Sequence, residues 1–343
     1  MRRIKQYSLQ IIALLLVIVL VESAALVGTL SALRERNPDA MEEQSGPMTE
    51  DTLPDWLTPQ EPQPEEPETY TGLTAAQILS NAQLIAHGMG KIADVTTLNC
   101  LESFRLQYEK GVRVFEVDLR MTSDMQVVLR HDWRAGWQNG VSETQIPTLE
   151  EFRAKLLLGK YTPMSFRDLL LLMEDYPDVC VITDSKFTDA ETVTVQFEAM
   201  LRDAAELGLE HAFERIVVQV YNELMFRVVD GIGDFPNYVY TLYNTGFNQT
   251  EEAFEEIAAF CSENGIAGVT MWNYWWRENF KPIAEQYGVS VYVHTVNDAQ
   301  MARELIESGV QAIYTDEIAP GDLEESPEET EETEPTEQTE GEV

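Results

Sequence analysis

The chain has 343 residues, a length that suits one barrel-sized domain with appendages at its ends. It carries 23 Lys and Arg against 60 Asp and Glu, which gives a net charge of −37. So acidic a protein is repelled by phosphate backbones and by anionic lipid headgroups, and we therefore expect no nucleic-acid partner and no direct adhesion to a bilayer surface.

Residues 1–36 have the pattern of an export signal. Three basic residues among the first five precede an apolar run over residues 11–21. Apolar residues resume after Glu22 and complete a span of about 20 residues, although Glu22 inside it would cost about 3 kcal/mol. The small residues around Ser23 offer a cleavage site instead. We expect an exported protein, held at the cell membrane by a signal anchor or secreted if the signal peptide is cut.

Two acidic segments flank the central part of the chain. Residues 37–70 are rich in Pro, Glu, Gln and Thr and hold ten acidic residues, and residues 320–343 hold eleven, with no Lys or Arg in either segment. Chains of this kind repel themselves and bury little apolar surface. The composition predicts a disordered linker and a disordered tail, which leaves residues 71–319 as the folded domain.

The folded domain alternates short apolar runs with amphipathic helical segments. We expect strands at residues 84–88, 112–119, 179–186, 215–221, 237–243, 267–273, 289–297 and 312–317. Several of the segments between them end at a Gly, as helices commonly do. Eight strands that alternate with helices in about 250 residues predict an α/β fold, a (β/α)8 TIM barrel.

The run FEVDLRMTSDMQVVLRHD, residues 115–132, carries the first candidate site residues. Side chains alternate along a strand, so Glu116 and Asp118 point to the same face. Turn-forming residues follow, and a second short strand over residues 127–130 brings His131 to its end. A solvated strand face would explain the two acids alone, but not their position in a barrel.

Polar residues also stand at the ends of other expected strands. His87 closes the first strand, Asp184 and Lys186 close the third, Trp272 closes the sixth and His294 lies in the seventh. Because chemistry in such barrels takes place where the strands end, we expect these side chains to share one site. Ordinary packing would explain any one of them but explains the whole set poorly.

Several of these motifs resemble one known family. The H-G at residues 87–88, the block F-E-V-D-L-x-M-T-S-D-x-x-V-V-L-x-H-D, the D-S-K at residues 184–186, the V-H-T-V-N at residues 293–297 and the closing G-V-Q-A-I-Y-T-D-E are similar to those of the glycerophosphodiester phosphodiesterases. This family belongs to the phosphatidylinositol phospholipase C-like superfamily of barrels. The resemblance covers nearly all of residues 82–318.

The resemblance implies roles for five residues. His87 and His131 would act as the acid/base pair, and Glu116, Asp118 and Asp184 would bind one divalent cation. Three carboxylates without thiolates form a hard-oxygen site that suits Ca²⁺ or Mg²⁺. In the family scheme a glycerol hydroxyl attacks phosphorus and expels the alcohol, and the cyclic phosphate is then hydrolysed to glycerol phosphate.

Four further residues are predicted to contact the substrate. Lys186 would neutralise a phosphate oxygen, or form a salt bridge to the site acids. Arg134, rather than Arg130, would supply a guanidinium near His131. Trp272 would cage a choline-like cation, stack on a sugar or inositol ring, or only pack the barrel. His294 stands where the family often has Trp, and it would face the pocket or be an ordinary barrel histidine.

The sequence also departs from the family pattern. It has His87-Gly88-Met89 where H-R-G is usual and Thr97-Leu98-Asn99-Cys100 where P-E-N-T is usual, so an Arg and a Glu are missing together. This resembles a divergent bacterial branch with T-N-S-L-E in place of P-E-N-T.

We expect a metal-dependent enzyme that hydrolyses small glycerophosphodiesters or glycerol-phosphate polymers. The missing Arg and Glu leave two alternatives. One is a barrel that binds a phosphorylated or glycan ligand without turnover, and the other is a phospholipase-type lyase that releases a cyclic phosphate.

Overall fold

The computed structural model describes residues 72–133, 146–233, 235–243 and 246–324. The predicted export signal, the predicted linker and Arg134 lie outside these residues. Across the ranges just given, no helix is both long enough and apolar enough to cross a membrane.

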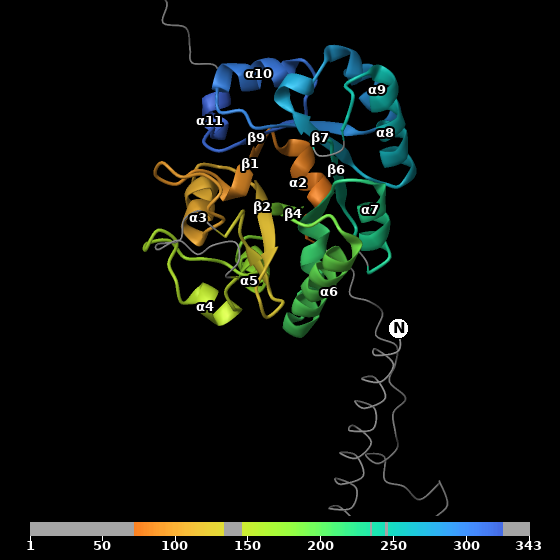
Figure 1. Ribbon diagram of the computed structural model, residues 1–343. Helices are drawn as coiled ribbons and strands as arrows, with labels where there is room; N and C mark the ends of the chain where they lie inside the picture. The colour runs from red at the N-terminus through yellow and green to blue at the C-terminus, as the bar shows by residue number, and fades with distance from the viewer. Residues whose placement is uncertain (1–71, 134–145, 234, 244–245, 325–343) are drawn as a thin grey trace, which may run out of the picture. The chain divides into compact units, whose positions relative to one another are not determined.

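Eight parallel strands close into a barrel, and one antiparallel strand extends it (Figure 1). The strands are β1 (Leu84–Ala86), β2 (Val114–Met121), β3 (Val127–Leu129), β4 (Cys180–Ser185), β5 (Ile216–Val220), β6 (Tyr238–Thr241), β7 (Gly268–Trp272), β8 (Ser290–His294) and β9 (Ala312–Thr315). The barrel closes because β1 pairs with both β9 and β2. β3 forms an antiparallel hairpin with β2. All eight expected barrel strands and the short second strand of the hairpin are confirmed.

Helices cover the outside of the barrel (Figure 1). The α-helices are α2 (Ala75–Asn81), α3 (Leu101–Glu109), α4 (Leu149–Arg153), α5 (Phe166–Asp175), α6 (Ala190–Leu207), α7 (Glu223–Asp230), α8 (Glu251–Glu263), α9 (Lys281–Tyr287), α10 (Ala299–Glu307) and α11 (Pro320–Leu323). Short 3₁₀ helices are η3 (His87–Met89), η4 (Glu210–Arg215), η5 (Asn273–Trp275) and η6 (Glu278–Phe280). Side chains such as Ser165 and Thr250 cap the first turns of α5 and α8, which fixes where these helices begin.

One predicted boundary is wrong by a few residues. α11 lies inside the segment that we expected to be a disordered tail, so the folded domain extends past residue 319. Pro320 stands in the first turn, where its missing N–H costs nothing, and the Asp322 carboxylate accepts a hydrogen bond from the Ala319 N–H at 2.8 Å. The acidic composition of residues 320–343 as a whole predicted disorder, although Pro320 and Asp322 are residues that favour the first turn of a helix.

The barrel is closed at its amino-terminal end by an apolar layer. Ile78 and Leu79 of α2 pack in one cluster with strand residues that include Val114, Ile182 and Val217. Figure 1 shows α2 lying across the end of the barrel. Apolar side chains thus form the amino-terminal end, whereas the predicted polar residues stand at the carboxyl ends of the strands.

Candidate active site

The predicted site residues meet at the carboxyl ends of the strands. A cavity of about 240 Å³ lies there. It is lined by His87, Glu116, His131, Asp184, Lys186, Gln219, Tyr243, Trp272, His294, Thr295 and Tyr314. The structure therefore brings together seven of the nine predicted residues around one cavity. Asp118 lies directly beside it, and Arg134 lies outside the described residues.

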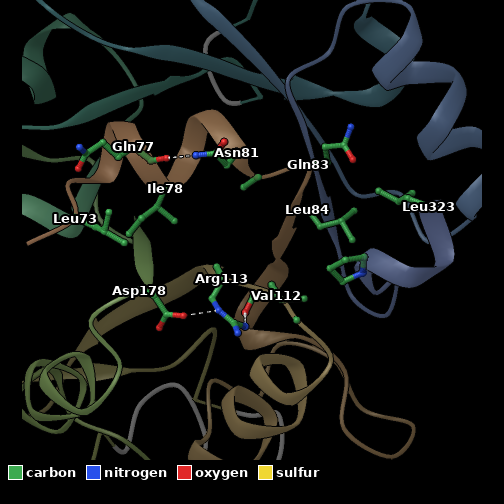
Figure 2. A pocket seen from close by; sticks show the side chains of 13 residues that line it. Leu73, Gln77, Ile78, Asn81, Gln83, Leu84, Val112, Arg113, Asp178 and Leu323 are labelled. Carbon is green, nitrogen blue, oxygen red and sulfur yellow. Dashed lines mark hydrogen bonds and ion pairs between the residues drawn. The ribbon is translucent and has the colours of Figure 1, made fainter.

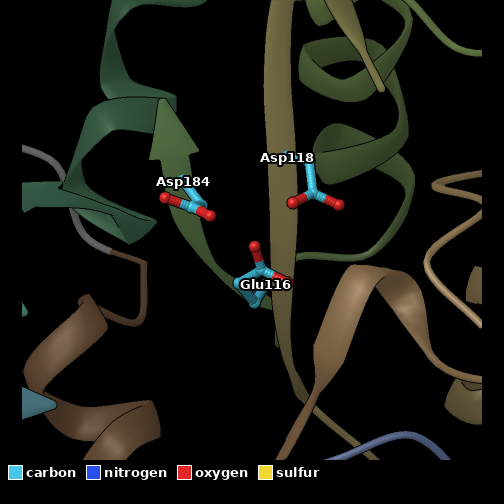
Figure 3. Close-up of side chains that lie close together, drawn as sticks. All are labelled: Glu116, Asp118 and Asp184. Carbon is cyan, nitrogen blue, oxygen red and sulfur yellow. The ribbon is translucent and has the colours of Figure 1, made fainter. Parts of the chain in front are cut away.

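Three buried carboxylates form the centre of the site. Glu116 and Asp118 point from β2 toward Asp184 on β4, as Figure 3 shows. Their exposed fractions are only 3%, 0% and 6%, and ligand oxygens of all three lie within 4.8 Å of one another. Burial, followed by the charge of Asp118, raises the pKa of Glu116 to about 8. Such crowding of like charges is stable only beside a strong source of positive charge.

Lys186 supplies part of that charge. Its Nζ lies 2.5 Å from Oδ1 of Asp118 and donates a hydrogen bond to Oδ2 of Asp184. Burial lowers the pKa of Lys186, but the charges of Asp118, Asp184 and Glu116 outweigh burial and raise it. Lys186 therefore forms a salt bridge to the site acids, which was one of its two predicted roles.

Backbone and amide groups hold the two β2 acids in place. The Gly88 N–H donates to Oε2 of Glu116 at 2.6 Å. The Asn99 side chain donates to Oδ2 of Asp118 at 2.6 Å and accepts from the Asp118 N–H at 2.9 Å. Asn99, which is fully buried, was not among the predicted site residues. It stands at the Asn position of the P-E-N-T motif, and this was the signal in the sequence that could have indicated it.

Asp184 is held by groups from two neighbouring strands. Its Oδ1 accepts a hydrogen bond from the Gln219 amide at 2.9 Å and another from the Tyr221 hydroxyl. The Tyr221 hydroxyl in turn lies 2.5 Å from the Tyr243 hydroxyl. Burial, with the charge of Asp184 next, raises the pKa of Tyr221 and keeps its proton available for this hydrogen bond. Neither Gln219 nor Tyr243 was among the residues predicted from the sequence.

Both predicted catalytic histidines are oriented by an aspartate. Nδ1 of His87 donates to Oδ1 of Asp316 at 2.9 Å, and Oδ2 of Asp316 accepts from the Asn297 amide at 2.7 Å. Nδ1 of His131 lies 3.1 Å from Oδ2 of Asp132. When each Nδ1–H is committed to a carboxylate, each Nε2 remains for the cavity.

The two histidines differ in their surroundings. Burial lowers the pKa of His87, but the hydrogen bond to Asp316 and the charges of Glu116 and Asp118 outweigh it and raise the pKa to about 9. The His131 side chain is 46% exposed, against 29% for His87. His87 therefore belongs to the charged interior of the site, whereas His131 stands at its edge.

The missing arginine of the H-R-G motif has a structural counterpart in Gly88. This residue adopts a φ of +54°, and a Cβ placed on it would lie 2.5 Å from Cα of Thr97. The loop that carries Thr97 occupies the space that a side chain at Gly88 would need. Leu98, which occupies the Glu position of P-E-N-T, is 2% exposed in an apolar cluster with Trp133. The two positions of the missing charged pair are thus closely packed in this loop.

The three carboxylates fit a divalent cation. They offer hard oxygen ligands that lie within 4.8 Å of one another. If all three acids are ionised, Lys186 balances one of three negative charges. A bound divalent cation would balance the other two and relieve the repulsion that raises the pKa of Glu116.

A second cavity lies at the opposite end of the barrel. Figure 2 shows it between α2, the first residues of the strands and α11. It has a volume of about 620 Å³, larger than that of the site, and its walls are mainly apolar, with Leu73, Ile78 and Leu84 beside the Arg113–Asp178 ion pair. Its described lining residues hold neither a histidine nor a cluster of acids, so the chemistry belongs to the smaller cavity.

A parallel barrel with two imidazoles and three carboxylates at the carboxyl ends of its strands has the groups for acid/base chemistry beside a cation. Residues 91–221 match the model of the glycerophosphoryl diester phosphodiesterase family. The matched segment covers fewer than half of the 343 residues, and it supports an assignment of this part of the barrel to the phosphodiesterases.

Solved structures share the fold. A protein assigned to the glycerophosphoryl diester phosphodiesterases, from Silicibacter pomeroyi, has 21% identity and a TM-score of 0.57, with 71% of this chain and 92% of the other covered. A glycerophosphodiester phosphodiesterase from Parabacteroides distasonis has 18% identity and a TM-score of 0.54, with coverage of 69% and 93%. A phosphodiesterase from Oleispira antarctica, solved with the product sn-glycerol-3-phosphate, has 14% identity and a TM-score of 0.53, with coverage of 68% and 92%.

Proposed function

We propose that this protein is a metal-dependent phosphodiesterase that hydrolyses glycerophosphodiesters to an alcohol and glycerol phosphate. The observation that carries the proposal is the convergence of two aspartate-anchored histidines and three buried carboxylates on one cavity of about 240 Å³. The product bound to the Oleispira antarctica phosphodiesterase, sn-glycerol-3-phosphate, supports the choice of substrate. A glycerol-phosphate polymer would present the same phosphodiester to the site.

Glu116, Asp118 and Asp184 would hold the cation, and their oxygen ligands favour Ca²⁺ or Mg²⁺. When bound, the cation lowers the pKa of a hydroxyl and offsets the charge of the phosphate. Lys186 lies beside two of these acids, and we infer that it turns its ammonium group toward a non-bridging phosphate oxygen when substrate enters.

The two histidines would transfer protons in two half-reactions. In the first, one imidazole accepts the proton of a glycerol hydroxyl as its oxygen bonds to phosphorus. The other imidazole donates a proton to the oxygen of the departing alcohol as the P–O bond breaks. In the second, the roles reverse while water opens the cyclic phosphate. Asp316 and Asp132 keep Nε2 of His87 and of His131 available for these transfers.

We also propose that the enzyme works outside the cytoplasm, at the cell membrane or in secreted form. The support is the basic and apolar pattern of residues 1–36, which precedes the catalytic domain. An acidic linker over residues 37–70 would separate the two. Fractionation of cells that express the full chain would detect the protein in the cytoplasm if this proposal is wrong.

The test of the activity is a direct assay of the full chain. Glycerophosphocholine, glycerophosphoethanolamine, glycerophosphoinositol and a glycerol-phosphate polymer are each supplied with Ca²⁺, Mg²⁺ or a chelator, beside the variant His131→Ala. We expect metal-dependent release of glycerol phosphate that the substitution abolishes. Accumulation of a stable cyclic phosphate would identify a lyase instead. Binding of these compounds without turnover would favour the non-catalytic barrel.

A further inference from the structure

Four aromatic rings gather beside the acids at the cavity. We call this group, Tyr243, Trp272, His294 and Tyr314, the aromatic wall. The His294 ring is central, because its centroid lies 4.6 Å from that of Trp272, 5.5 Å from that of Tyr243 and 5.9 Å from that of Tyr314. All four residues line the cavity, yet the proton transfers described above do not use their polar groups.

The aromatic wall contains two polar atoms without partners. Nε2 of His294 and the hydroxyl of Tyr314 are buried, and neither has a hydrogen-bond partner among the residues that the structure describes. A buried polar group without a hydrogen-bond partner destabilises the protein, and Phe at either position would fill similar space without that cost. Two such atoms on neighbouring rings at one cavity point to a ligand that completes their hydrogen bonds.

Both groups are electrically neutral. Burial, together with the charge of His87, lowers the pKa of His294 to about 3, so its imidazole carries one donor and one acceptor nitrogen. Burial and the charge of Glu116 raise the pKa of Tyr314, which keeps its hydroxyl proton. Neutral donors and acceptors match the hydroxyl groups of an alcohol, whereas a phosphate is better matched by Lys186.

The aromatic wall continues toward solvent as a flat surface. The Tyr274 ring stacks on Trp272, with a centroid distance of 6.0 Å and an interplanar angle of 15°. Tyr274 is 63% exposed, so this pair joins the cavity to the surface of the protein. Flat aromatic faces pack well against the C–H faces of a saturated ring, while the ring's hydroxyl groups remain free to form hydrogen bonds.

We propose that the aromatic wall binds the alcohol part of the phosphodiester and selects a cyclic polyol, that is, a saturated ring with several hydroxyl groups. This inference rests on the proposed phosphodiesterase function and names its substrate class. A trimethylammonium group would also find favourable aromatic faces here. It has no N–H or O–H, however, and would leave Nε2 of His294 and the Tyr314 hydroxyl buried without partners.

The experiment compares kcat/KM of the full chain for glycerophosphoinositol and glycerophosphocholine. The variants are His294→Phe and Tyr314→Phe, which remove one polar atom each and keep a ring. Matched controls are His211→Phe, at a surface ion pair with Glu174, and Tyr240→Phe, in the apolar core. We expect wild type to prefer glycerophosphoinositol. Each cavity variant should lose about tenfold in kcat/KM for it, mainly through KM, and stay within about twofold for glycerophosphocholine.

Two results would overturn the proposal. One is a wild-type preference for glycerophosphocholine, and the other is an equal loss on both substrates in the variants. Absence of any turnover by wild type would instead refute the proposed function. The aromatic wall is then tested by calorimetric binding of glycerophosphoinositol to His131→Ala with and without His294→Phe. We expect about tenfold weaker binding in the double variant, and equal affinities would overturn the inference.

Discussion

Asp316 offers the sharpest test of how the site positions a proposed catalytic group, the imidazole of His87. Its Oδ1 lies 2.9 Å from Nδ1 of His87, and its Oδ2 accepts a hydrogen bond from Asn297. Asp316→Asn keeps the shape of the side chain but removes its charge. An opposite charge at hydrogen-bonding distance raises an imidazole pKa by about one to three units. The pKa of His87, about 9 with Asp316 present, should therefore fall by that amount.

The sign of the stability effect follows from the same shift. The pKa of His87 is raised from 6.5 in the unfolded chain to about 9 in the folded protein. The pairing of protonated His87 with Asp316 therefore stabilises the folded protein fully below the unfolded-state pKa of 6.5. This contribution to the free energy of unfolding is lost as the pH rises through about 9. Asp316→Asn should cost about 1.4–4 kcal/mol in the free energy of unfolding at acidic pH, and little above pH of about 9.

Two measurements check this prediction. NMR titration of the His87 ring in the chelated protein gives its pKa without a cation nearby, and urea unfolding at both ends of the pH range gives the stability. In the metal-loaded enzyme we expect kcat to fall about 100-fold or more, because the imidazole loses its orientation. Asp298→Asn, which preserves the N-cap of α10, is the control. An unchanged His87 titration and an unchanged kcat would refute the reasoning.

Three further predictions test other parts of the site. His131→Ala should abolish turnover and leave Ca²⁺ binding intact, because its half-exposed ring is no ligand; calorimetry and the activity assay check this together. Since Glu116 must lose a proton to bind a cation and its pKa is raised to about 8, Mg²⁺ affinity should rise with pH up to about 8, and Glu116→Gln should remove that dependence. Gly88→Ala should destabilise the fold by more than Gly208→Ala, as urea unfolding would show. Both glycines have a positive φ, but only at Gly88 would the new Cβ meet the backbone, at Thr97. Equal costs would mean that the close contact is unimportant.

The parts of the site that sequence analysis predicted are those encoded by local patterns. Glu116 and Asp118 are two residues apart on one strand, so strand geometry alone places them on one face. Asp184 ends the neighbouring strand, and the register pairs it with Asp118. The alternation of strands and helices predicted a barrel. In a barrel the carboxyl ends of all strands lie at one end, so the fold predicted which residues would meet.

The supporting residues could not be found in this way. Asp316 is separated from His87 by 229 positions, and only closure of the barrel between β9 and β1 brings them together. Asn99 reaches Asp118 because its loop folds back onto Gly88. Thr97 and Asn99 both have a positive φ in this loop, and no periodicity in the sequence encodes that path. Likewise, nothing in the sequence indicated that the Tyr314 hydroxyl would be left without a partner at the cavity.

The cavity at the amino-terminal end of the barrel has a practical consequence. Leu73 and Leu323, near the two ends of the described domain, both line this cavity, as Figure 2 shows. The described domain therefore begins and ends on the side remote from the candidate active site. A reporter domain or an affinity tag joined at either end of the described domain would not cover the cavity that holds the candidate active site. Immobilised or fused forms of the enzyme should retain full turnover.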